Sequence, residues 1–260
     1  MYKQYNLQES LKMLTNNINF RNYQNYSAPQ SRITPNAEKA PNSQLSGDTV
    51  SFSSKNKNKL GFSSQFLYNT NIKQLNENGE AKFIPAKITK LNPDDTEDVE
   101  AMKTINKSWI KTAYGDEITY NFKHPKNIDL YLAVELDDDK KELADKILCL
   151  AQTSSKADHR ARGYNDIHLR HLQSAPACEH GKKENQFKGA GEVLMYGICK
   201  YAKDLGFSDL TLYSTNNPFY NHLEMPKAPD LGMSYYAFRK DAMNRFMNKI
   251  EEKYEIPKQD

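Results

Sequence analysis

The stretch Gln186-Phe187-Lys188-Gly189-Ala190-Gly191 leads directly into an amphipathic run over residues 192–202. Two glycines in a short polar loop let backbone N–H groups face outward with no side chain in the way. The helix predicted behind the loop adds partial positive charge at its N-terminus. Together these features predict a binding site for a phosphate or pyrophosphate group.

Composition limits the classes of function that the chain can have. The 260 residues carry a net charge of +3 with a mean hydropathy of −0.85, which favours neither a nucleic-acid partner nor a membrane surface. No apolar run reaches the length of a spanning helix, and the first residues lack a signal-peptide core. Three cysteines, Cys149, Cys178 and Cys199, argue against a disulfide scaffold or a cysteine-based zinc site. We therefore predict a soluble cytoplasmic protein.

Residues 1–80 differ in texture from the rest of the chain. They hold 14 Asn and 10 Ser with few long apolar side chains, and nine basic residues face only five acidic ones. Such a segment buries too little apolar surface to offset the entropy of ordering. We predict a disordered, low-complexity N-terminal tail over residues 1–80 and a folded domain over residues 81–256. A docking segment for a partner is the alternative for the tail.

The folded region alternates between strand and helix patterns, but not regularly. Strands are predicted over residues 83–91, 128–136, 146–153, 165–174, 210–214 and 233–238, and helices over 96–109, 192–205, 217–223 and 241–254. Three consecutive strands with short links indicate antiparallel pairing, so a doubly wound parallel sheet is not expected. The pattern predicts an α+β (mixed α/β) fold with a central, mostly antiparallel sheet flanked by helices.

The glycine loop follows the fourth predicted strand, whereas a dinucleotide-binding loop follows the first. It also lacks the third glycine and the downstream ribose-binding acid of that motif. The pattern Gln186-x-x-Gly189-x-Gly191 instead resembles the acyl-CoA loop of the GNAT superfamily of N-acetyltransferases. Two further stretches are similar to that family: residues 172–176, at the end of its fourth strand, and residues 212–225, with the segment that contains Phe219 and Tyr220.

The resemblance covers roughly residues 83–254 and is strongest over 167–225. Three features depart from the family pattern: a longer insertion at residues 177–185, a shorter link between Ser214 and Tyr220, and Glu224 where glycine is common. Because this link is shorter, the spacing from the preceding asparagines to Tyr220 differs from that of the family pattern.

The resemblance implies acetyl-CoA as co-substrate, with no metal. Backbone N–H groups around the glycine loop would hold the CoA pyrophosphate, and the end of the fourth strand would pair with the pantetheine arm. The implied cofactor-binding residues are Leu172, Gln173, Ser174, Gln186, Phe187, Lys188, Gly189, Ala190, Gly191, Glu192, Asn216 and Asn217.

The implied reaction is direct transfer of an acetyl group from the thioester to an amine. Tyr220 would protonate the departing thiolate, because the reference pKa of tyrosine, about 10, is close to that of a thiol, about 8.5. The base stays open among Glu135, Asp166, His168, His171 and a water chain. Asp166 and His168 are carried beside Tyr220 as candidate catalytic residues.

The acceptor amine, on a small molecule or a protein, is not readable from the sequence, because the fold does not choose it. A non-enzymatic GNAT-like module that binds CoA or a protein partner is the alternative function. A zinc site at His168, His171, Cys178 and His180 is not predicted, because strand periodicity directs the two strand histidines to opposite faces.

Overall fold

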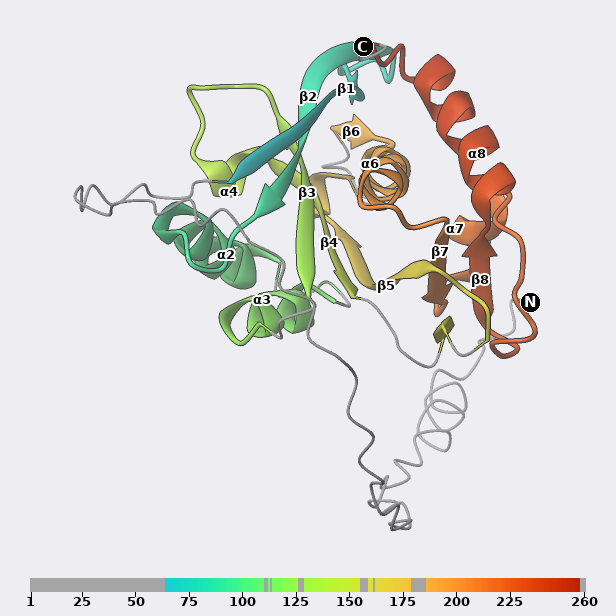
Figure 1. Ribbon diagram of the computed structural model, residues 1–260. Helices are drawn as coiled ribbons and strands as arrows, with labels where there is room; N and C mark the ends of the chain where they lie inside the picture. Colours follow the sequence, from blue (N-terminus) through green and yellow to red (C-terminus); the bar gives the residue numbers. More distant parts are fainter. Residues whose placement is uncertain are drawn as a thin grey trace, which may run out of the picture. The chain divides into compact units, whose positions relative to one another are not determined.

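One eight-stranded sheet organises the chain in the computed structural model, which describes residues 64–109, 112, 114–125, 129–154, 159–160, 162–178 and 186–257. The strands lie in the order β6-β1-β2-β3-β4-β5-β7-β8. All neighbouring pairs are antiparallel except β5 and β7, which run parallel. The predicted α+β class with a mostly antiparallel sheet is confirmed (Figure 1).

The elements follow the chain in an irregular alternation. The strands are β1 (Gln65–Leu75), β2 (Ala81–Leu91), β3 (Leu130–Leu136), β4 (Ile147–Ser154), β5 (Asp166–Ser174), β6 (Phe187–Lys188), β7 (Asp209–Tyr213) and β8 (Tyr235–Phe238). The helices are α2 (Thr96–Ser108), α3 (Gly115–Lys123), α4 (Leu143–Lys146), α6 (Ala190–Asp204), α7 (Asn217–His222) and α8 (Lys240–Lys253), with a 3-10 turn η1 at Pro176–Cys178.

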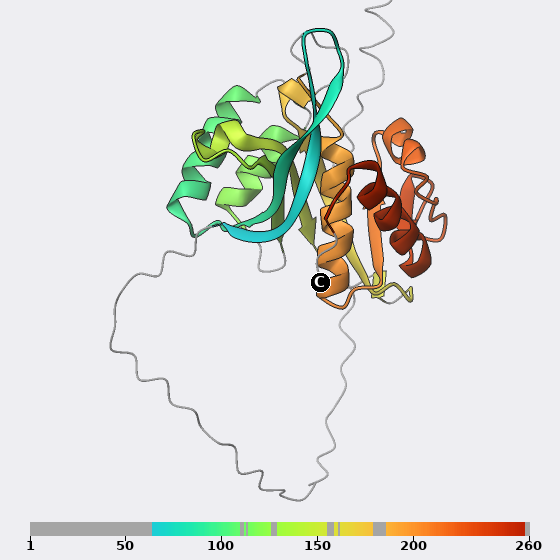
Figure 2. The ribbon, with the colours of Figure 1, turned by 90° about the horizontal axis from the view of Figure 1, so that it is seen from above.

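Helices cover both faces of the sheet, so it carries two apolar cores. The larger core joins α6 and α8 to the strands through residues such as Val134, Leu194 and Phe246. The smaller one joins α2 and α3 to the opposite face, with Met102 and Phe122 fully buried. Figure 2 shows α6 and α8 on one side of the strands and α2 and α3 on the other. Each fully buried side chain of this kind contributes about 1.5–3 kcal/mol.

Helix α6 lies closer to the sheet than any side chain at its midpoint would permit. A Cβ atom on Gly197 would lie 2.6 Å from Cδ1 of Ile88 in β2. The helix is almost entirely apolar on the buried face and ends before Gly206, whose φ of +82° is the left-handed conformation typical of the residue after a helix.

Strand β1 corrects part of the tail prediction. Residues 65–75 were expected to belong to the unstructured tail, but they pair with β2 along their whole length and bury Tyr68, Thr70 and Ile72 at every second position. Residues 1–63 of the predicted tail lie outside the described residues. Helices α3 and α4 and the short β6 are further elements that the sequence pattern did not predict.

In the described ranges, no helix combines the length and the apolar character needed to cross a bilayer.

Candidate active site

Helix α6 begins with a backbone that only glycine adopts readily. Gly189 is the N-cap residue and has a φ of +87°. The first intrahelical contact is made by Val193 N, which donates to Gly189 O at 2.9 Å. The N–H groups of Ala190, Gly191 and Glu192 therefore precede the helical hydrogen-bond ladder, and they point the positive end of the helix dipole outward. This is the geometry predicted for an anion cradle.

Strands β5 and β7 separate halfway along β5. Their parallel pairing runs from Asp166 opposite Asp209 to Leu169 opposite Leu212 and stops there. The second half of β5 continues to pair with β4 on its other edge, where Ser174 lies opposite Cys149. Among the described residues, the edge of residues 170–174 that faces β7 is thus outside any strand pairing, although the strand pairs with β4 on its other edge.

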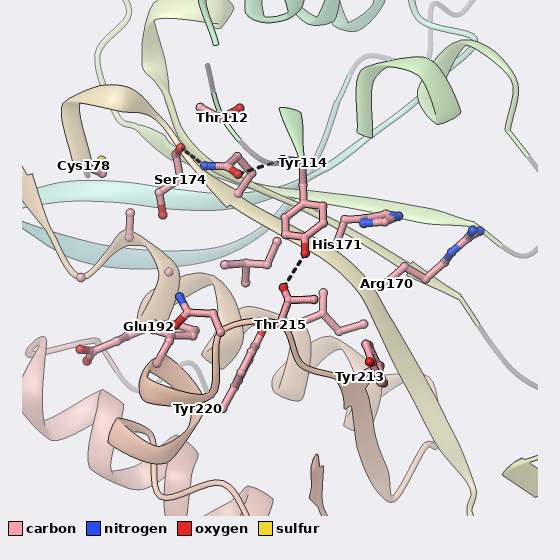
Figure 3. Close-up of a pocket in the computed structure, with 18 residues that line it drawn as sticks. Thr112, Tyr114, Arg170, His171, Ser174, Cys178, Glu192, Tyr213, Thr215 and Tyr220 are labelled. Carbon is pink, nitrogen blue, oxygen red and sulfur yellow. Dashed lines mark hydrogen bonds between the residues drawn. The ribbon is translucent and has the colours of Figure 1, made fainter. Parts of the chain in front are cut away.

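A cavity of about 690 Å³ occupies the opening between the two strands and the start of α6. Nine of the predicted site residues line it: Leu172, Gln173, Ser174, Gly189, Ala190, Gly191, Glu192, Asn216 and Tyr220. The floor is narrow at Gly191, where a Cβ atom would lie 3.2 Å from the Phe219 ring and 3.7 Å from Leu172. Figure 3 shows side chains from both halves of the sheet directed into this space.

Four predicted cofactor residues do not line the cavity. Phe187 and Lys188 form β6 and pair with Gln74 and Lys73 of β1, and Phe187 is buried in the core. The backbone of Gln186 is engaged as well, because its carbonyl accepts from Leu75 N and its N–H donates to Ala177 O. Asn217 is an exposed residue in the first turn of α7. The cradle therefore starts at Gly189, later than the motif suggested, because the residues before it are used to extend the sheet.

Asp166 and His168 also lie away from the cavity lining. Both are buried at the start of β5 in a cluster with His159 and Thr211. Of the four side chains considered as bases, His171 is the one that lines the cavity, whereas Glu135 is buried in β3. His168 and His171 do not converge, as predicted, and His180 lies outside the described residues.

Tyr220 is held by aromatic neighbours on the short helix α7. Its ring centroid lies 5.1 Å from that of Phe219 and 5.8 Å from that of Tyr236. Burial, followed by the influence of Cys149 and Tyr114, raises the pKa of the Tyr220 phenol above its usual value of 10. The phenol is therefore protonated over the whole physiological range and cannot act as a base. The same shift moves its pKa further from the thiol value of about 8.5, so the close match expected from the sequence does not hold, and Tyr220 is a weaker acid toward a thiolate.

A hydrogen bond crosses the cavity between elements that are far apart in sequence. The Tyr114 hydroxyl lies 2.5 Å from Oγ1 of Thr215, and Tyr114 N donates to Oε1 of Gln173 at 3.2 Å. In the view of Figure 3, Arg170 and His171 lie on one side of the Tyr114–Thr215 bond. Ser174 and Glu192 lie on the other side in the same view.

His171 borders a second cavity, of about 480 Å³, whose lining includes Asp116, Glu117 and Tyr120. Its Nδ1 atom lies 3.2 Å from Oε2 of Glu117. The two atoms are not hydrogen-bonded, since Nδ1 has no hydrogen-bond partner among the described residues, and they form an ion pair only when the imidazole is protonated. Burial lowers the pKa of His171 below its usual value of 6.5, and the Glu117 carboxylate opposes that shift in part. The imidazole is therefore neutral at neutral pH, and it lines both cavities.

The side chain of Glu192 is occupied by partners at the foot of α6. Its carboxylate accepts from Nζ of Lys253 at 2.6 Å and from the Tyr254 hydroxyl at 3.2 Å, and it lies 3.1 Å from Nε2 of His222. A carboxylate in the first turn is favoured by the helix dipole. It also puts negative charge beside the predicted anion cradle, balanced here by Lys253.

Several lining residues were missed by the sequence reasoning: Thr112, Tyr114, Arg170, Cys178, Tyr213 and Thr215. Tyr114 precedes a helix that the pattern did not reveal, and no local signal marks it as part of a site. Arg170 and Tyr213 belong to predicted strands. Each directly follows the last residue of its strand in the β5–β7 pairing, and this position, where β5 and β7 separate, is the feature that could have identified them as part of the site.

No family model and no curated protein matches the chain. Solved structures that resemble the chain do so at 10–14% identity. One is a protein from Exiguobacterium sp. 255-15 assigned as an acetyltransferase, with 14% identity, a TM-score of 0.41 and coverage of 62% of this chain and 97% of that one. Another is AtaTR bound with AcCoA, with 10% identity, a TM-score of 0.41 and coverage of 62% and 96%.

A third, the KacTA–DNA complex, has 14% identity, a TM-score of 0.38 and coverage of 58% and 86%. At these identities and scores the likeness supports no statement on activity, and the function is inferred from the geometry of the site.

Proposed function

We propose that the chain is an acyl-CoA-dependent N-acyltransferase that transfers an acetyl group from acetyl-CoA directly to an amine. One observation carries the proposal: β5 and β7 separate after Leu169, and α6 begins at the base of the opening with Gly189 in a left-handed conformation. A ligand that fits this arrangement has an extended, amide-bearing arm and an anionic group at one end. Acetyl-CoA has both.

The donor is held by backbone groups. The pantetheine amides pair with the free edge of β5 over residues 172–174, in the manner of an added strand. The pyrophosphate accepts hydrogen bonds from the N–H groups of Ala190, Gly191 and Glu192, where the helix dipole favours negative charge. Asn216 and the side chain of Gln173 lie along the same wall of the cavity.

The acyl carbon is attacked by the nitrogen of the acceptor amine, and the C–S bond of the thioester breaks. A backbone N–H of β5 near Ser174 stabilises the carbonyl oxygen as it gains charge. The departing thiolate takes its proton from the Tyr220 hydroxyl, and the amine gives its proton to His171, directly or through water. The neutral state of His171 and the protonated state of Tyr220 are the ones that these roles require.

The acceptor reaches the reaction centre from the side of Arg170 and His171. Both residues line the main cavity and the second cavity, which opens toward Asp116 and Glu117. The mixture of acidic and basic side chains there selects no single class of amine.

Calorimetric titration with acetyl-CoA tests the proposal. We expect one equivalent to bind and Gly191→Glu to abolish binding, because the new side chain meets Phe219 and brings negative charge to the cradle. Thr104→Glu, which adds the same charge on the exposed face of α2, is the matched control and should bind as the wild type does. A wild-type chain that binds no CoA ester would rule the proposal out. Release of the CoA thiol over a panel of amines then distinguishes an enzyme from a CoA-binding module.

A further inference from the structure

A second group of chemically active side chains lies at the start of β5, outside the cavity of the proposed acyl transfer. It consists of His159, Asp166 and His168, and one donor atom from each lies within 4.8 Å of the other two. All three are buried, with 1–3% of each residue exposed. Three potential metal ligands in such close proximity and so far from solvent need a physical explanation.

The fold brings these side chains together from two segments. Asp166 and His168 are two residues apart in β5, so they project from the same face of the strand. His159 comes from the connection between β4 and β5, and Thr211 of β7 lies opposite His168 in the parallel register. Oγ1 of Thr211 lies 2.9 Å from Nδ1 of His168 and 3.2 Å from Nδ1 of His159, and it donates to Oδ2 of Asp166. All three side chains thus contact the Thr211 hydroxyl, and their ligand atoms surround it.

The Asp166 carboxylate is incompletely satisfied. Its Oδ2 atom is 2.7 Å from Nδ1 of His159, but Oδ1 is buried and has no hydrogen-bond partner in the described part of the chain. A buried carboxylate oxygen without a partner is costly, and native proteins usually provide one. An unpaired acceptor on a ligand-forming side chain is an observation separate from the clustering itself, and it points to a cation.

We propose that His159, Asp166 and His168 bind one divalent transition-metal ion, with Zn²⁺ as the best match. Two imidazole nitrogens and one carboxylate oxygen form a donor set typical of zinc, whereas Mg²⁺ and Ca²⁺ prefer oxygen alone. The Thr211 hydroxyl or a water completes four-coordination. Tetrahedral ligands at 2.0–2.2 Å lie roughly 3.3 Å apart, so the His159–Asp166 pair has to widen only slightly.

With the Thr211 hydroxyl as the fourth ligand the site would be closed by protein groups, and its burial keeps substrates away, so we assign the metal a structural role. The metal would tie the segment that carries His159 to β5 and β7. His168 is followed directly by Leu169, the residue after which the two strands part. The metal would therefore hold β5 and β7 together over the half where they pair. This half lies next to the half where the strands separate and line the cavity. The proposal does not depend on acyl transfer, and its test does not use activity.

Zinc binding to the full chain is the test. After removal of metals with a chelator, the chain is titrated with Zn²⁺ against a chromophoric competitor, and with Co²⁺ while the visible spectrum is recorded. We expect one equivalent of zinc, the intense bands of tetrahedral Co²⁺, and a rise in melting temperature with zinc. His159→Ala should lower zinc affinity about 100-fold or more. His124→Ala, at an exposed histidine, is the matched control and should change nothing.

Three results would overturn the proposal: no stoichiometric zinc, an octahedral cobalt spectrum, or equal affinity in His159→Ala and the wild type. Any of them would mean that the cluster is a hydrogen-bond network in which His159 and Thr211 donate to Asp166. If His159→Ala fails to fold, X-ray absorption of the zinc-loaded wild type decides. A first shell of nitrogen and oxygen with two imidazoles supports the site, and sulfur in that shell contradicts it.

Discussion

The hydroxyl of Tyr254 occupies the place where any side chain on Gly189 would have to start. A Cβ atom on Gly189 would lie 1.8 Å from the Tyr254 oxygen and 2.5 Å from the ring carbon that bears it. Tyr254 is buried beyond the end of α8, so its ring has little room to withdraw. The start of α6, and with it the anion cradle, is thus shaped by the C-terminal helix.

Gly189→Ala is therefore expected to disturb both stability and donor binding. The left-handed φ alone costs an alanine about 1–2 kcal/mol, and displacement of Tyr254 adds to that. Gly206→Ala is the matched control, because Gly206 has a φ of +82° and no atom within 4 Å of its Cβ position. We expect denaturant unfolding to show a larger loss for Gly189→Ala, and calorimetry to show weaker acetyl-CoA binding in that variant alone. Equal behaviour of the two variants would contradict the steric role of Tyr254.

The Glu192 carboxylate is expected to limit the affinity for CoA esters. It lies in the first turn of α6 and neutralises Lys253 at 2.6 Å. Glu192→Gln removes one negative charge from the cradle and leaves Lys253 free to attract phosphate. At low ionic strength we expect acetyl-CoA to bind about three- to fivefold more tightly, and salt to reduce the gain.

The exposed pair Lys249–Glu224, at 2.7 Å, supplies a control for that experiment. Glu224→Gln makes the same chemical change next to α8 but outside the lining of the cavity, and it should leave affinity unchanged. Weaker binding in Glu192→Gln would instead assign the Glu192 side chain a direct part in holding the donor.

Much of the fold followed from local pattern, and the exceptions have physical reasons. Residues 130–136 and 147–154 are long apolar runs buried on both faces, and α6 has a clear apolar stripe. Strand β1 instead buries every second residue, namely Tyr68, Thr70 and Ile72, and its outward positions are rich in Asn and Gln. Such residues are typical of an unstructured tail, and only the pairing with β2 makes the strand stable.

The site was predictable only in part, because half of it arises from contacts distant in sequence. The glycine loop marks one wall through local backbone chemistry, whereas the Tyr114–Thr215 bond joins residues 101 positions apart. Lys188 pairs with Lys73 of β1, so the backbone of this part of the motif belongs to the sheet and does not line the cavity. Neither relationship leaves a trace in residue spacing.

Tyr220→Phe is expected to lower kcat about 100-fold while acetyl-CoA binds as before. The variant removes the proton donor but keeps the ring that packs against Phe219 and Tyr236. Because the pKa of Tyr220 is raised, its deprotonation should cause no loss of activity below about pH 10. Steady-state rates and calorimetry on the same preparations separate the two effects. Tyr201→Phe, on α6 outside the cavity, is the control, and undiminished turnover in Tyr220→Phe would dismiss the acid role.

The acid side of the pH profile should report His171. A base acts in its neutral form, so kcat/KM should rise with pH through a pKa below 6.5 and level off before neutrality. Glu117 stabilises the imidazolium, so Glu117→Gln should lower the pKa of His171 further and move this limb to lower pH. Glu97→Gln, at an exposed position of α2, is the control and should leave the acid limb of the pH profile unchanged.

The same shift has a consequence for stability that can be measured without substrate. Because the pKa of His171 is lower in the folded chain than in the unfolded one, the unfolded chain binds the extra proton first, and this group destabilises the fold as pH falls below about 6.5. His171→Asn should flatten that part of the curve of unfolding free energy against pH. An acid limb of kcat/KM that persists unchanged in both His171→Asn and Glu117→Gln would exclude His171 as the base and favour a water chain.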